Sequence, residues 1–321
     1  MRSVYFDYNA TTPLDPAVRE AMLPFLDAVW GNPSSVHHVG RRARALLDDS
    51  RERAAALFGA SPSEIIFTSG GTESNNLAIF GSARALISKG KHLITSQIEH
   101  HAVLDCFAEL EKNEGFQVSR LPVDKNGFVS VDDLKKSIRM DTVLVSVMAA
   151  NNEIGSLQPV AELGAVCRER GIIFHTDAVQ WFGKEPVSSF SQFNADLVSV
   201  CAHKLHGPKG AGLLYARSPF HPRPLYFGGP HEFEHRAGTE NLASIVGLVS
   251  SLESFVKVPV FIRSSLDPLV HRLRIGVEIL PGCTLVSPVS CCLGNTVSFV
   301  VEGVEGISVL AELISAAPFI P

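Results

Sequence analysis

The sequence predicts an α/β fold in which a mainly parallel sheet lies between helices. Two observations carry this prediction. From about residue 64 to residue 216, short apolar segments alternate with helical segments. The short segments are apolar almost without interruption, as in strands that are buried on both faces of a parallel sheet. A chain of 321 residues can hold one large domain, or a large and a small one.

The beginning of the chain is expected to precede the sheet. Residues 4–12 are predicted to form a short strand that leads into a Thr-Thr-Pro turn. Asp15 followed by Pro16 matches the N-cap and first position of a helix that runs to about Val29. A long helix is predicted over 37–58, because the segment is rich in residues that favour helices.

The alternating part of the chain supplies the sheet. Strands are predicted over residues 64–68, 91–96, 117–121, 142–148, 172–177, 196–200 and 211–216. Helices are predicted over residues 73–88, 100–113, 130–139 and 160–170. Apolar strands separated by helices indicate a mainly parallel sheet.

The rest of the chain leads away from the sheet. It is predicted to form a helix over 241–256, then a helix, a loop, a strand over 295–301 and a helix over 306–314. We expect a large ligand-binding domain of residues 14–255. Residues 1–13 together with 256–321 are expected to form a smaller, incomplete α+β domain.

Composition and charge exclude several classes of protein. The net charge of −5 and the lack of a dense Lys/Arg run argue against nucleic-acid binding. Apolar runs are too short to span a membrane, and the N-terminus lacks the apolar stretch of a signal peptide, so a cytoplasmic protein is expected. The six cysteines do not suggest a disulfide framework. The histidines lack partners at ligand spacing, so no metal is expected.

A lysine at the end of a buried strand is the first candidate for chemistry. Lys204 follows the strand predicted over 196–200 and precedes a Gly/Pro turn. Burial disfavours the charged form of an amine, and a neutral amine attacks carbonyl groups. Lys204 is therefore a candidate for a Schiff base with pyridoxal phosphate (PLP). The alternative is a lysine just past a strand end, with its amine in water.

Two earlier strand ends carry residues that suit such a cofactor. Gly70, Gly71 and Thr72 open a helix, and the free N–H groups of a helix N-terminus bind phosphate. A tight turn without a ligand is the alternative. His100 follows the next strand, where an imidazole can stack on a flat ring and move protons. The alternative is a histidine at a helix start that faces water.

The next two strand ends carry amides and an acid. Asn151 and Asn152 can orient polar groups. A buried carboxylate at Asp177 would keep the pyridine nitrogen of PLP protonated, as the electron-withdrawing ring requires. The alternative for Asp177 is an N-cap of the following segment. Because ligands of open α/β sheets lie at the carboxyl ends of the strands, the combination favours a PLP site.

Several motifs together make the chain similar to a known family. They are Asp7–Pro13, Gly31–Ser35, Phe67–Leu77, Asn151–Gly155, Thr176–Ala178, His203-Lys204 and Arg236–Asn241. With these motifs, the chain resembles the cysteine desulfurases of the nitrogen-fixation and iron–sulfur-assembly type, in the class V aminotransferase family. The resemblance implies a fold-type I PLP-dependent transferase. It also implies a homodimer with each site near the subunit interface.

The resemblance assigns roles around the ring of the cofactor. Lys204 would bind the cofactor covalently and later move the Cα proton. His100 would stack on the ring and assist proton transfer. Asp177 would pair with the ring nitrogen, and Gln180 would contact the ring hydroxyl. Asn152 would contact both cofactor and substrate.

The resemblance also assigns a phosphate site. Gly71, Thr72 and His203 would hold the phosphate, and the adjacent Ala202 belongs to the same cofactor-binding segment. Cys201 stands where a serine often donates to the phosphate, and a thiol is a poorer donor. Thr239 would reach the phosphate of the partner subunit's cofactor.

The implied reaction converts L-cysteine to L-alanine. A cysteine thiolate of the enzyme takes the substrate sulfur as a persulfide and passes it to a scaffold protein or a tRNA-thiolation enzyme. The family's nucleophilic loop follows the segment matched by 306–314, where this sequence reads Ser315–Pro321. The sequence therefore predicts a truncated desulfurase with little persulfide-forming activity. The alternatives are a selenocysteine lyase or other class V PLP enzyme, and a non-catalytic PLP-binding remnant.

Overall fold

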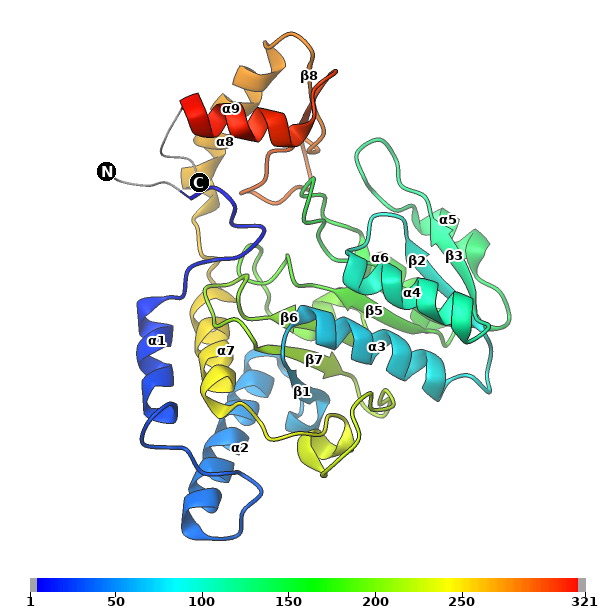
Figure 1. Ribbon diagram of the computed structural model, residues 1–321. Coiled ribbons are helices and arrows are strands. Elements are labelled where there is room, and N and C mark those ends of the chain that lie inside the picture. Colours follow the sequence, from blue (N-terminus) through cyan, green and yellow to red (C-terminus); the bar gives the residue numbers. More distant parts are fainter. Residues whose placement is uncertain (1–4, 317–321) are drawn as a thin grey trace.

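The computed structural model describes residues 5–316, which form a central sheet between helices and a further group of elements beyond it (Figure 1). The helices are α1 (Pro16–Met22), α2 (His38–Phe58), α3 (Gly71–Ala85), α4 (His101–Asn113), α5 (Val131–Ser137), α6 (Val160–Glu169), α7 (Leu242–Phe255), α8 (Arg263–Glu278) and α9 (Gly306–Ala316). The strands are β1 (Ile65–Thr68), β2 (His92–Ser96), β3 (Gln117–Leu121), β4 (Thr142–Ser146), β5 (Ile173–Asp177), β6 (Leu197–Cys201), β7 (Gly212–Ala216), β8 (Cys283–Leu285) and β9 (Phe299–Val301).

The central sheet has the strand order β1-β7-β6-β5-β4-β2-β3. The neighbouring pairs from β6 through to β3 are parallel, whereas β7 runs antiparallel to both β1 and β6. Every strand predicted between residues 64 and 216 is present, within a few residues at its ends. The prediction of a mainly parallel sheet between helices is therefore confirmed.

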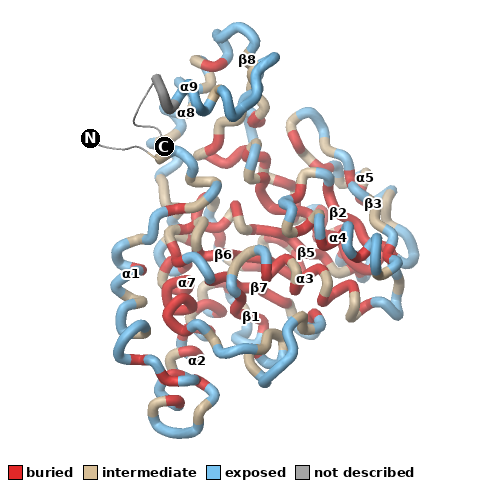
Figure 2. Tube along the Cα trace, viewed as in Figure 1, coloured by how far each residue is buried: buried red, intermediate tan, exposed pale blue. Residues whose placement is uncertain are grey.

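Helices cover both faces of this sheet because neighbouring side chains on a strand point to opposite faces. In β4, Leu144 belongs to an apolar cluster that includes Ile79 of α3 and Phe107 of α4. The adjacent Val145 belongs to a larger cluster that includes Leu163 of α6. Figure 2 shows the result, with buried residues concentrated along the strands. In open α/β sheets, ligands bind at the carboxyl ends of the strands.

The first helix is shorter than the sequence predicts. Asp15 caps α1 as expected, but the helix ends at Met22 instead of near Val29. A single 3-10 turn over Leu23–Phe25 follows. Pro24 has no N–H, so it cannot donate the hydrogen bond that would continue the α-helix.

The strand predicted at the beginning of the chain is wrong. Residues 5–12 contain a turn and no strand, and Val4 lies outside the described residues. The backbone of this segment bonds to the loop after β6, where the N–H of Thr12 donates to the carbonyl of His203 at 2.9 Å. Its conformation is set by this distant contact and not by strand pairing.

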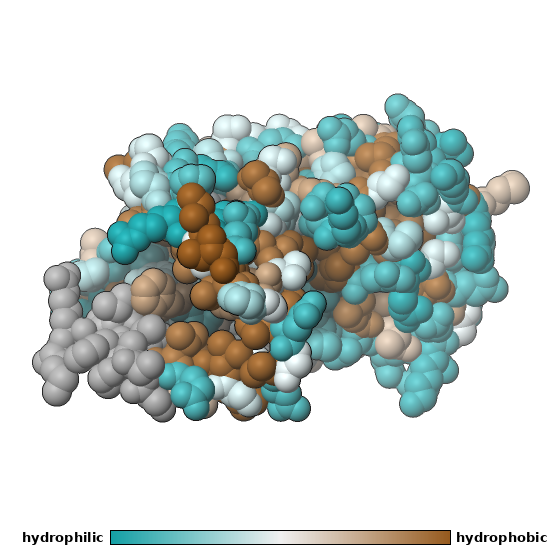
Figure 3. Space-filling view, turned by 90° about the horizontal axis from the view of Figure 1, so that it is seen from above, coloured by the Kyte–Doolittle hydropathy of each residue, from teal (hydrophilic) through white to brown (hydrophobic). Residues whose placement is uncertain are grey.

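The elements after Val256 lie apart from the sheet and bury few side chains. The strand predicted over 295–301 shortens to β9, which pairs antiparallel with β8, a strand that the sequence analysis missed. In α8 only Val277 is buried. Apolar side chains such as Ile279 and Ile307 are mostly exposed. In Figure 3, which looks onto this end of the molecule, apolar residues lie open on the surface.

Among residues 5–316, no helix is both long and apolar enough to cross a membrane. Within the same residues, no group of three or more His, Cys, Asp and Glu side chains is arranged to hold a metal ion.

Candidate active site

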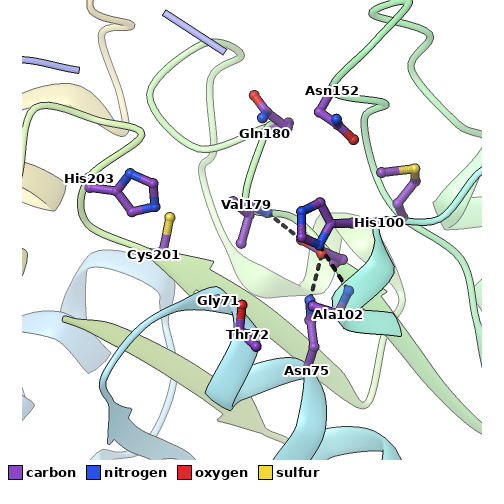
Figure 4. Close-up of a pocket in the computed structure, with 12 residues that line it drawn as sticks. Gly71, Thr72, Asn75, His100, Ala102, Asn152, Val179, Gln180, Cys201 and His203 are labelled. Carbon is purple, nitrogen blue, oxygen red and sulfur yellow. Dashed lines mark hydrogen bonds between the residues drawn. The ribbon is translucent and has the colours of Figure 1, made fainter. Parts of the chain in front are cut away.

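A pocket with about 450 Å³ of empty space lies at the carboxyl ends of β5 and β6, beside the start of α3. Its lining residues are Gly71, Thr72, Asn75, His100, Ala102, Met148, Asn152, Asp177, Val179, Gln180, Cys201 and His203. Figure 4 shows Cys201 and His203 on one side, His100 on the other, and Gln180 and Asn152 together at the rim. Eight residues that the sequence analysis selected therefore come together in one pocket.

One end of the pocket is suited to an anion. Gly71 and Thr72 form the first turn of α3, where backbone N–H groups have no partner within the helix. A Cβ added to Gly71 would lie 2.7 Å from Cγ2 of Val179, so this position has no room for a side chain. His203 lies nearby, and its Nδ1 is 3.1 Å from the hydroxyl of Thr11. The cradle thus offers close backbone approach and an imidazole.

Asp177 supplies a buried acid at the end of β5. Its Oδ1 accepts from the N–H of Val179 at 2.9 Å, and its Oδ2 accepts from Nδ2 of Asn75 at 2.7 Å (Figure 4). Burial raises the pKa of the Asp177 carboxyl, and these two bonds oppose the rise. Asp177 therefore caps the following turn and also lines the pocket, so the two interpretations of this residue are compatible.

Asn75 is a site residue that the sequence analysis did not select. It lies on α3 one turn after Gly71, and only 1% of it is exposed. Its Oδ1 has no hydrogen-bond partner among the described residues. An asparagine four positions after Gly71, in the first turns of a glycine-rich helix start, was the signal that the sequence offered.

His100 is held by the helix that it begins. Its Nδ1 accepts from the N–H of Ala102 at 3.0 Å, as an N-cap of α4. Because Nδ1 accepts, a neutral His100 ring carries its proton on Nε2. The ring is exposed and lines the pocket at the same time, so its nitrogen chemistry is open to a ligand.

Lys204 lies next to the pocket but does not line it in this structure. Its Nζ donates to the backbone carbonyls of Asn9 and Ala10, the latter at 2.8 Å. Burial lowers the pKa of the amine, while Cys201 and Asp177 oppose the shift. The lysine is thus neither fully in water nor fully enclosed.

A second lysine, which the sequence analysis missed, lies behind the pocket. Lys184 is 3% exposed, and its Nζ donates to Oδ1 of Asn9 at 2.6 Å and to Oε1 of Gln180. Burial, with a smaller contribution from the charge of Lys204, lowers the pKa of Lys184 to about 7. Asn9 and Lys184 were missed because their role depends on contacts between distant segments. A lysine in the apolar stretch four residues after Gln180 was the local signal.

Thr239 does not line this pocket. It is exposed and lines a second pocket, with about 530 Å³ of empty space, on the other side of the turn after β1. Arg236 also lines that pocket, and its Nε donates to Glu73 at 2.8 Å. The role of Thr239 toward a partner subunit stays a prediction.

The donors and acceptors of the main pocket fit a flat, phosphorylated pyridine cofactor. A helix N-terminus and His203 are placed for the phosphate, and the buried Asp177 is placed for a protonated ring nitrogen. Together with the sheet, this arrangement defines an α/β protein with a pocket at the carboxyl ends of parallel strands.

Comparison with known proteins identifies the family. A family model described as aminotransferase class-V matches residues 4–317. The cysteine desulfurase IscS of Dictyoglomus turgidum is 48% identical over 313 residues, which are 97% of this chain and 79% of that protein. The IscS of Methanosarcina thermophila is 46% identical over 97% of this chain and 77% of its own length. The chain belongs to the class-V aminotransferase family.

Solved structures agree with this assignment. A NifS-like protein superposes with a TM-score of 0.93 at 39% identity, covering 99% of this chain and 86% of that one. A structure described as SspA in complex with cysteine has a TM-score of 0.85 at 35% identity, with 98% and 87% of the two chains covered. The expected fold-type I architecture and the resemblance to cysteine desulfurases are therefore confirmed.

Proposed function

We propose that this protein is a PLP-dependent cysteine desulfurase that converts L-cysteine to L-alanine and transfers the sulfur to an acceptor. The observation that carries the proposal is the pocket itself, which brings together the start of α3, the buried Asp177 and His203, the neighbour of Lys204 in the chain. The 48% identity with an IscS desulfurase over nearly the whole chain supports the choice of reaction.

The residues of the pocket would hold PLP at two ends. Gly71, Thr72, Cys201 and His203, together with the adjacent Ala202, would surround the phosphate. When bound, PLP supplies an electron-withdrawing ring that stabilises negative charge at the α-carbon of an amino acid.

Other residues would hold the ring. Asp177 would hold a proton on the ring nitrogen, and the bonds from Asn75 and Val179 keep its carboxylate oriented for this task. His100 would cover one face of the ring, and Gln180 would bond its hydroxyl.

Lys204 and His100 would move the protons of the reaction. An amine whose pKa is lowered by burial is neutral in a larger fraction of molecules, and only the neutral form can bond a carbonyl carbon or accept the α-proton. The Nε2 of His100 is the free nitrogen of that ring and would pass a proton to or from the substrate. Asn152, at the rim, would orient the substrate.

We assign the sulfur-accepting step to none of the six cysteines. Cys201 is the one that lines the pocket, but burial raises the pKa of its thiol to about 12, so it stays protonated and is a poor nucleophile. We propose that a homodimer acts in the cytoplasm, with Thr239 reaching the partner subunit's site. A thiolate supplied by a scaffold protein or a tRNA-thiolation enzyme would then bond the substrate sulfur and take it as a persulfide.

The test separates proton movement from sulfur transfer. Purified protein with PLP is incubated with L-alanine in deuterated water, and exchange of the α-proton is followed by NMR. We expect exchange in the wild type and a loss of at least about 100-fold in Lys204→Ala. Exchange that is equal in the two proteins would contradict the role of Lys204.

A second assay tests the reaction. Alanine formed from L-cysteine, and from L-selenocysteine, is measured in the presence of a thiol reductant. Alanine from L-cysteine supports the desulfurase, whereas alanine from L-selenocysteine alone would identify a selenocysteine lyase. Bound PLP without either product would identify a PLP-binding protein without this activity.

A further inference from the structure

Lys184 is a buried amine without a carboxylate partner. It lies in the segment between β5 and β6, and none of the ion pairs among the described residues includes it. Its two acceptors are neutral amide oxygens, Oδ1 of Asn9 and Oε1 of Gln180. Burying an ammonium group away from a counter-charge is costly, so its bonds to these two amides must be well made.

The amine of Lys184 fixes which way the amide of Gln180 faces. Nζ of Lys184 donates to Oδ1 of Asn9 and to Oε1 of Gln180, so the oxygen of the Gln180 amide is turned toward the lysine. The NH₂ group of Gln180 therefore faces the other way, and its Nε2 donates to the backbone carbonyl of Asn9 at 2.9 Å. Gln180 lines the pocket, so Lys184 determines whether the pocket meets a donor or an acceptor there.

The same amine also fixes Asn9. Because Oδ1 of Asn9 accepts from Lys184, its Nδ2 is left to donate to Oγ1 of Thr296 at 2.9 Å and to the backbone carbonyl of Asn152 at 3.2 Å. The backbone carbonyl of Asn9 in turn accepts from the amine of Lys204. One buried amine thus connects Gln180, the N-terminal turn and Lys204.

We propose that Lys184 is a positioning residue for the cofactor pocket. It sets the orientation of the Gln180 amide and the position of the Asn9 turn that holds the Lys204 amine. This inference rests on the proposed function, since it assumes that the pocket binds PLP.

The test is a double-mutant cycle on cofactor affinity. Lys184→Met, Gln180→Ala and the double variant are prepared without PLP, and the dissociation constant for PLP is measured by absorbance titration. If Lys184 acts through Gln180, each single variant should bind PLP about tenfold more weakly, from the loss of one charge-assisted or neutral hydrogen bond. The double variant should then be no weaker than the weaker single variant.

Two controls separate positioning from loss of stability. Lys125→Met makes the same exchange at an exposed lysine and should leave the dissociation constant unchanged. Val256→Ala removes a fully buried side chain outside the network and should lower the melting temperature without changing PLP affinity. The absorbance band of bound PLP should shift alike in Lys184→Met and Gln180→Ala and should not shift in either control.

Additive losses in the double variant, or a change below about twofold in Lys184→Met, would overturn the inference. If Lys184→Met does not fold, Asn9→Ala replaces it in the cycle, because Asn9 supplies the other acceptor of Lys184. Coupling with Gln180→Ala is again the expected result, and additivity again contradicts it. A wild-type protein that does not bind PLP would instead contradict the proposed function.

Discussion

Apolar side chains are mostly buried in the central sheet and mostly exposed in the elements after Val256. The largest apolar cluster runs from Val29 to Val256 and includes side chains from both ends of the sheet. Beyond Val256, the described apolar residues with less than a tenth of their surface exposed are Val277, Cys292 and Leu293. The sequence predicts apolar faces in both regions. Among the described residues, the sheet region buries its apolar faces, whereas the elements after Val256 leave theirs largely exposed. The division into domains of 14–255 and of 1–13 with 256–321 stays a prediction.

Two phenylalanines test this difference most strongly. Phe190 is 1% exposed and packs on Phe58 with ring centroids 4.3 Å apart, whereas Phe299 of β9 is 36% exposed. We expect Phe190→Ala to lower the free energy of unfolding by about 3–5 kcal/mol and Phe299→Ala by less than about 1 kcal/mol. Urea denaturation measures both. Similar losses in the two variants would show that the two regions are equally packed.

Two ion pairs extend the comparison from aromatic to charged side chains. Arg51 and Glu232 form a buried pair at 2.6 Å, with side chains 5% and 1% exposed. Arg263 joins α8 to Glu185 at 2.8 Å but is 49% exposed. We expect Arg51→Met to cost about 3 kcal/mol of stability, because Glu232 is left buried and unpaired, and Arg263→Met to cost at most about 1 kcal/mol. The same denaturation curves decide, and an equal cost for both pairs would contradict the comparison.

A buried acid in the sheet region should make the stability of the protein depend on pH. Burial raises the pKa of Glu99 to about 8, and its Oε2 has no partner among the described residues. The folded state therefore favours protonated Glu99, and this stabilisation is complete below about pH 4.5 and is lost as the pH rises through about 8. Glu99→Gln, neutral at every pH, should gain about 4 kcal/mol over the wild type at pH 9 compared with pH 5.

Thermal unfolding across this pH range measures the effect. The same exchange at Glu278, which is exposed on α8, is the control. A constant difference between Glu99→Gln and the wild type from pH 5 to pH 9 would contradict the raised pKa.

Two thiols provide the mildest test, which changes reactivity and not stability. Cys201 of β6 is 1% exposed with a pKa raised to about 12, whereas Cys291 in the C-terminal region is exposed. In the folded protein, iodoacetamide should modify Cys291 at least about ten times faster than Cys201, as peptide mass spectrometry would show. Faster labelling of Cys201 would mean that the pocket holds a reactive thiolate.

The sheet could be predicted because its signals are local. Each apolar strand lies between helix starts and glycine stops that are visible in the sequence, and Asp177 and Lys204 were found because they end such strands. Residues 5–12 could not be placed correctly, because their conformation depends on bonds to the loop after β6, such as that between Thr12 and His203. Asn75 and Lys184 were missed for the same reason. Their partners lie on other segments or turns, and no periodic pattern identifies them.

The turn at Asn9 has a consequence for the order in which the site can be completed. Asn9 is made long before its partners, since its side chain bonds Thr296, 287 residues later, and its carbonyl bonds Lys204, 195 residues later. Contacts so far apart in sequence form late, because a long loop must close before they stabilise the chain. During synthesis on the ribosome, the sheet can therefore assemble before Thr296 is available to bond the N-terminal turn. The Asn9 turn, which bonds Gln180 and Lys204, has all of its partners only when that residue has emerged.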